Sequence, residues 1–92
     1  MDEQKIIVTI SGADKIGIVA QFTAVLAKYC VNIEDIKQTL MQGHFIMFLL
    51  GDISKSQYSF KEIKEALSKK GEELGMEAWV QKKAIFDGMH SV

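Results

Sequence analysis

A short loop flanked by glycines constrains this chain more than any other segment. The residues Gly12-Ala13-Asp14-Lys15-Ile16-Gly17-Ile18 separate a β-branched stretch from a helical one, so a strand must become a helix within one tight connection. The first N–H groups of a helix lack intrahelical partners, and the helix dipole is positive at that end. The loop is therefore a tight turn and also a candidate anion-binding site.

The segments on either side of the loop have clear periodicities. Residues 5–11 alternate with Ile6, Val8 and Ile10 on one face, which predicts a strand. Residues 17–30 carry apolar side chains about every 3.6 residues, which predicts an amphipathic helix. Cys30 ends this apolar stripe, so we expect a buried, inert thiol there.

The rest of the chain repeats the alternation of strands and helices. Residues 33–41 and 44–50 predict two strands joined by a reversal at Gln42-Gly43. The residues Ser59-Phe60-Lys61-Glu62 fit a capping box ahead of a second helix, which Gly75 would end. Residues 76–82 predict a fourth strand.

The order β-α-β-β-α-β predicts an α+β protein with the ferredoxin-like fold. In this fold two helices cover one face of a four-stranded antiparallel sheet, and the first and third strands are central. The helix-free face would expose Ile7, Trp79 and part of the third strand, and such a patch usually marks an interface. We therefore expect a homodimer.

The chain is expected to form one domain over residues 1–92, with a core of about residues 4–83. The C-terminal tail, residues 84–92, carries Ile85, Phe86, Met89 and Val92. We expect this apolar tail to pack back on the domain or on a dimer partner.

Composition excludes several functions. All 11 basic residues are Lys, and with 12 acidic residues the net charge is −1. The balanced charge and the lack of Arg argue against nucleic-acid binding and against an arginine-based phosphate cradle. A single cysteine and the lack of a signal-like or membrane-length apolar run predict a cytoplasmic protein without membrane contact.

The candidate chemistry centres on the loop. A small zwitterion could place its carboxylate on the N–H groups of Ile16, Gly17 and Ile18 and its ammonium on Asp14. Lys15 could add a point charge, and Asn32 could reach this region only across a subunit boundary. The alternative interpretation is that Asp14 caps the helix and the glycines serve the turn.

The other reactive side chains form no recognisable metal or catalytic site in the sequence. A metal site would need His44 and His90 to converge with a carboxylate such as Asp87, so we expect surface histidines, no metal and no cofactor. No nucleophile–base pair or pair of acids is recognisable, which predicts a protein that is not an enzyme.

The loop, together with Val31-Asn32-Ile33-Glu34-Asp35-Ile36 and the order of elements, resembles the ACT domain over essentially the whole chain. It looks most like single-domain ACT proteins related to glycine-cleavage-system repressors. The resemblance implies a regulatory fold that binds amino acids or similar metabolites at homodimer interfaces. By motif position it places Asp14, Lys15, Gly17, Ile18 and Asn32 at the ligand. The alternative function is a structural module that docks a partner protein without a metabolite.

Overall fold

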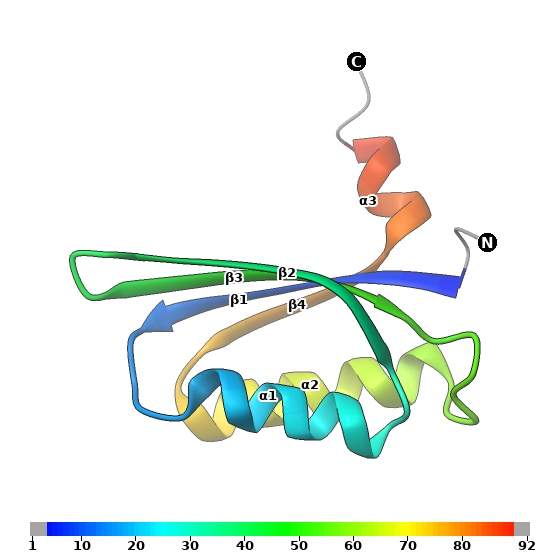
Figure 1. Ribbon diagram of the computed structural model, residues 1–92, viewed down its shortest axis with the longest axis horizontal. Coiled ribbons are helices and arrows are strands. Elements are labelled where there is room, and N and C mark those ends of the chain that lie inside the picture. The colour runs from blue at the N-terminus through cyan, green and yellow to red at the C-terminus, as the bar shows by residue number, and fades with distance from the viewer. Residues whose placement is uncertain (1–3, 90–92) are drawn as a thin grey trace.

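The computed structural model describes residues 4–89 of the chain, which form four strands and three helices (Figure 1). In chain order the elements are β1 (Lys5–Ala13), α1 (Ile18–Lys28), β2 (Asn32–Met41), β3 (His44–Asp52), α2 (Phe60–Leu74), β4 (Glu77–Lys82) and α3 (Lys83–Met89).

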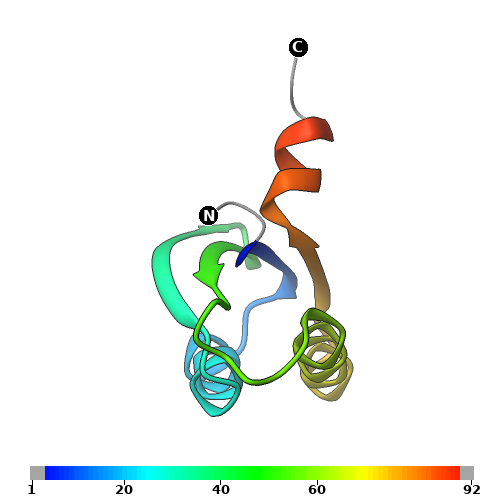
Figure 2. The same ribbon diagram turned by 90° about the vertical axis from the view of Figure 1, so that its right-hand side faces the viewer.

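The strands form one antiparallel sheet in the order β2-β3-β1-β4. Helices α1 and α2 lie side by side on one face of this sheet (Figures 1 and 2). The expected ferredoxin-like fold is confirmed, with β1 and β3 in the centre.

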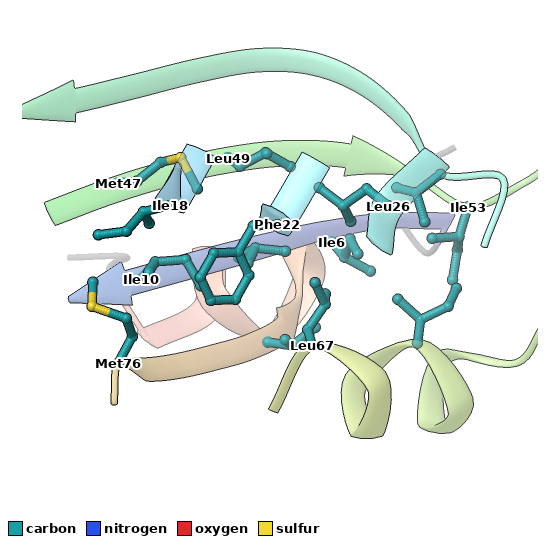
Figure 3. Close-up of a cluster of buried hydrophobic side chains, with 14 of the residues drawn as sticks. Ile6, Ile10, Ile18, Phe22, Leu26, Met47, Leu49, Ile53, Leu67 and Met76 are labelled. Carbon is teal, nitrogen blue, oxygen red and sulfur yellow. The ribbon is translucent and has the colours of Figure 1, made fainter. Parts of the chain in front are cut away.

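The core lies between the sheet and these two helices. On β1 the side chains of Ile6, Val8 and Ile10 point to the helices and are at most 1% exposed. Phe22 of α1 is fully buried and sits in the middle of the cluster (Figure 3). The cluster shown also includes Ile18, Leu26, Met47, Leu49, Ile53, Leu67 and Met76.

Helix α2 begins and ends as its sequence predicts. The Ser59 hydroxyl accepts the Glu62 N–H at 3.1 Å, and the Glu62 carboxylate accepts the Ser59 N–H at 2.8 Å. This reciprocal pair is the expected capping box. Gly75 ends the helix in the left-handed conformation, with φ of 68°.

The sheet face turned away from α1 and α2 is called the open face. Pairing across the strands places uncharged residues in its middle and charged residues toward its edges. Trp79 and Phe48 are 51% and 47% exposed there. The open face consists of Asp35, Lys37 and Thr39 (β2), His44, Ile46, Phe48, Leu50 and Asp52 (β3), Lys5, Ile7, Thr9, Ser11 and Ala13 (β1), and Glu77, Trp79 and Gln81 (β4).

Helix α3 follows β4 directly and rises from the sheet on the side opposite α1 and α2 (Figure 2). It contacts β1 and β4, and its Phe86 is half-buried while Ile85 is 58% exposed. His90 and Val92 of the expected tail lie outside the described residues. Packing of the tail on a dimer partner stays a prediction.

The expectation of a buried Cys30 is wrong. Helix α1 ends at Lys28, so the apolar stripe does not extend to Cys30, which is exposed. Its backbone is left-handed, with φ of 59°, in the turn that leads into β2. The physical reason is that the helix ends at Lys28, two residues before Cys30, so the helical period no longer decides which way the Cys30 side chain points.

Candidate functional site

The loop between β1 and α1 begins the helix without a side-chain cap. Gly17 occupies the N-cap position with φ of 83°, a left-handed conformation that favours glycine. Within residues 4–89 no side chain hydrogen-bonds to the first N–H groups of α1. The interpretation that Asp14 caps the helix is therefore wrong, because the left-handed Gly17 takes the cap position three residues later.

The backbone at Asp14 joins the loop to the hairpin of β2 and β3. The Asp14 N–H donates to the Gly43 carbonyl at 3.0 Å, in the turn of that hairpin. The hairpin extends past the end of β1 and lies over the start of α1 (Figure 1). Residues of the helix start and of the hairpin together line one hollow on the helix side of the sheet.

This hollow is a cavity of about 410 Å³. Loop and helix residues form one side, and hairpin residues form the other. It is lined by Asp14, Lys15, Gly17, Ile18, Val19, Ala20, Gln38, Thr39, Leu40 and Phe45.

The hairpin wall was not anticipated from the sequence. Gln38 and Leu40 pair with Met47 and Phe45, whose side chains are buried on the helix side, so both point toward the cavity side of the sheet. A polar residue between Ile36 and Leu40 on the apolar face of a strand was the available signal. Gln38 is the amide that this signal could have identified.

Lys15 lies in the cavity lining, but its ammonium is engaged elsewhere. It donates to the Leu74 carbonyl at the C-terminus of α2. A cation is favourable there, because carbonyls at a helix C-terminus carry partial negative charge. The approach is close: a Cβ added to Gly75 would lie 3.1 Å from the Lys15 Nζ. Lys15 therefore ties the loop to α2.

Two of the expected site residues lie outside the cavity lining. The Ile16 side chain is fully exposed at the tip of the loop. Asn32 begins β2 opposite Asp52, at the other end of α1. Within one chain, the structure brings together Asp14, Lys15, Gly17 and Ile18 but not Asn32.

The cavity combines groups that suit a small zwitterion. Uncapped N–H groups at the start of α1 can donate to a carboxylate. The carboxylate of Asp14 and the side-chain carbonyl of Gln38 can accept from an ammonium. Leu40 and Phe45 supply an apolar surface beside them. This is an arrangement for binding and orienting a ligand.

The remaining titratable side chains are dispersed. The Ser11 hydroxyl and the His44 Nε2 lie 2.9 Å apart, away from the cavity. Over the described part of the chain, three or more His, Cys, Asp or Glu side chains nowhere gather as metal ligands would. His90 lies outside that part. Within residues 4–89, no helix is long and apolar enough to cross a membrane.

Comparisons with known proteins agree with the fold. A family model described as "ACT domain" matches residues 4–81. A UPF0237 protein of Methanosarcina acetivorans is 40% identical over 92 residues, covering all of both chains. An ACT domain protein from Streptococcus pneumoniae superposes with a TM-score of 0.78 at 33% identity, covering 89% of this chain and 92% of that one.

A more distant structure shares the fold alone. A putative glycine cleavage system transcriptional repressor superposes with a TM-score of 0.76 at 19% identity. The match covers 85% of this chain and 44% of the other.

Proposed function

This chain belongs to the ACT domain family, and on that premise we propose that it is a non-catalytic regulatory protein of the cytoplasm. It binds an amino acid or a similar small metabolite at a homodimer interface. The observation that carries this proposal is the cavity at the start of α1, whose N–H groups have no side-chain cap among the described residues.

The ligand's carboxylate lies on the N–H groups at the start of α1, near Gly17 and Ile18. Its ammonium is held by Asp14 and Gln38, and its side chain lies against Leu40. Backbone donors matter in this chain because it contains no Arg to grip a carboxylate with two parallel hydrogen bonds.

The second subunit is proposed to lie along β2. This strand is the sheet edge beside the cavity, and all ten of its residues are exposed. Leu40 and Met41 are 58% and 70% exposed. A long, exposed edge strand with unpaired backbone groups is a template for pairing with another chain, which supports a contact between two copies at this edge.

Pairing of two β2 strands would also explain how Asn32 could reach the ligand although it lies at the far end of α1 within its own chain. In a symmetric antiparallel pair the start of one strand lies beside the end of the other. Asn32 of one copy then approaches Leu40 and Met41 of its partner, next to the cavity. Asn32 would thus complete the site from the neighbouring subunit.

Regulation follows if the ligand prefers one state of the dimer, because a ligand shifts an equilibrium only by its difference in affinity between states. The filled or empty dimer would then be recognised by a regulated protein partner. A protein that shares this fold at 19% identity is a putative glycine cleavage system transcriptional repressor.

The test is a thermal-shift screen of the wild-type protein against each of the common amino acids, followed by calorimetry on any that respond. A ligand at about 100 times its Kd adds about 2.7 kcal/mol to the free energy of unfolding, which is easily detected. Asp14→Ala should remove the shift, and Glu65→Ala, an exposed carboxylate on α2, should keep it. A flat response to every amino acid would contradict amino-acid binding.

A further inference from the structure

The open face lies on the opposite side of the sheet from the cavity, so neither the ligand nor its proposed β2 contact covers it. Trp79 and Phe48 expose about half of their surfaces there, and Ile7, Ile46 and Leu50 are half-buried between them. Large aromatic side chains gathered on one face are typical of an interaction surface.

The charges on this face are arranged as at an interface. In the middle rows that cross the sheet, from Ile7 to Ser11 on β1, the two central strands contribute only uncharged residues, and the charged pair Lys5 and Asp52 lies at one end of the face. One such row runs from Lys37 through Phe48 and Thr9 to Trp79. Asp35 and Glu77 lie on the edge strands with Lys37. An apolar centre with a charged rim is the usual anatomy of a protein–protein contact.

Helix α3 borders the open face on one side. It stands on the same side of the sheet, beside β4 (Figure 2). Phe86 of α3 and Ile7, Phe48 and Leu50 of the sheet line a cavity of about 270 Å³. Ile85 of the same helix is 58% exposed. The open face therefore has α3 standing along one side, where it can contact a sheet that packs on this face.

The size of the face fits a second copy of the chain. The strands contain 9, 10, 9 and 6 residues. At about 4.8 Å between strands and about 3.4 Å per residue, their flat footprint is roughly 550 Å². Side-chain relief and α3 increase this area toward the ~800 Å² that each partner buries in a standard interface.

We infer that the open face is a contact between two copies of this chain, packed sheet against sheet with α3 of each copy beside the partner. A neutral apolar centre is complementary to itself, as a two-fold contact requires. The rim carries Lys5 and Lys37 as well as Asp35, Asp52 and Glu77, so opposite charges can face one another, and a strongly charged partner finds no match. This contact goes beyond the proposed function, and with β2 pairing it builds an assembly larger than a dimer.

Trp79 is the only tryptophan in the chain, so its fluorescence reports on this face alone. The experiment combines sedimentation equilibrium with Trp79 emission of the full-length chain over a dilution series. At high concentration the emission should be blue-shifted relative to a solvated tryptophan. It should shift to the red on dilution as the mass falls by about twofold, because each open-face contact joins two units.

Phe48→Asp places a carboxylate in the centre of the contact and should lower the mass about twofold while shifting the Trp79 emission to the red. Thr9→Lys tests the same centre with the opposite charge, and circular dichroism verifies the fold of both. The matched control is Tyr58→Asp, an exposed aromatic residue outside the open face. Its mass and emission should equal those of the wild type.

The inference would be overturned if both folded variants had the mass and the Trp79 emission of the wild type. It would also be overturned if Trp79 of the wild type were solvated at every concentration, since the open face would then be free for a different protein. The proposed function can fail independently of the open-face contact. Phe48→Asp should retain any thermal shift with amino acids, because Phe48 lies outside the cavity at α1. Asp14→Ala should retain the blue-shifted emission of Trp79. A flat amino-acid screen with a twofold fall in the mass of Phe48→Asp supports the open-face contact alone.

Discussion

The connection from β1 into α1 and the connection from β3 into α2 are built in opposite ways. Before α2, side chains hold the backbone: the Asp52 carboxylate accepts the Ser54 N–H at 2.8 Å, and Ser59 and Glu62 form the capping box. Before α1, the helix start depends on the left-handed backbone of Gly17, without a side-chain cap from the described residues.

The difference supports the proposal that a ligand binds at the start of α1 and not at the start of α2. At α2 the chain supplies its own acceptor, the Ser59 hydroxyl, for the Glu62 N–H. At α1 the first N–H groups border a cavity of about 410 Å³. Such groups are stabilised by water or by an anion, and an anion also gains from the helix dipole. The proposed site is thus the place where the fold leaves donors unused.

The largest expected effect comes from replacing the glycine on which α1 depends. Gly17→Val should lower the free energy of unfolding by about 2 kcal/mol, and Gly17→Ala by about 1 kcal/mol, because a side chain disfavours the left-handed backbone. The cost is conformational: an added Cβ would come no closer than 4.0 Å to its nearest neighbour, the Gln21 amide. Urea unfolding of both variants measures it. Equal stability of all three proteins would contradict a left-handed Gly17.

Removing the cap of α2 should have the next largest effect. Ser59→Ala leaves the Glu62 N–H without its acceptor and should cost about 1 kcal/mol in urea unfolding. Ser59→Asp is the matched control, since aspartate is an equally good N-cap residue and should retain most of the stability. If alanine and aspartate gave the same loss, the hydroxyl would not be the cap.

The smallest effect is a pH dependence confined to the α2 connection. Hydrogen bonds from the Ser54 backbone and side chain lower the pKa of the Asp52 carboxyl, and Lys5 adds to this shift. A carboxyl whose pKa is lower in the folded state stabilises the protein above its unfolded pKa, near pH 4. That stability is lost as the pH falls through the folded pKa.

The measurement is the melting temperature of the wild type and of Asp52→Asn between pH 6 and pH 2. The asparagine variant should lose less stability in acid, because its amide does not titrate and can still accept the Ser54 N–H. Parallel curves for the two proteins would show that Asp52 contributes nothing to the pH dependence.

Local patterns predicted the parts of this structure that depend on neighbours in sequence. Alternation identified the strands, and the Ser59–Glu62 capping box and Gly75 marked both ends of α2. The loop at the start of α1 was also found, because glycines between a strand and a helix are a local signal. The resemblance to the ACT domain then led to the family.

The parts that could not be predicted depend on contacts between distant segments. Gln38 enters the cavity wall because the β2–β3 hairpin extends over α1, which no local pattern shows. Lys15 donates to the carbonyl of Leu74, 59 residues away, instead of pointing to a ligand. Cys30 was misplaced because the exact end of a helix is the least certain feature of a periodic pattern.

The uncapped start of α1 also has an evolutionary consequence. The fold requires glycine at position 17, but the side chain of Asp14 does not cap the helix and that of Ile16 is fully exposed. Substitutions at positions 14 and 16 can therefore accumulate at little cost in stability. A loop whose side chains at these two positions contribute little to stability can acquire a new ligand preference by drift and selection, while the fold stays the same.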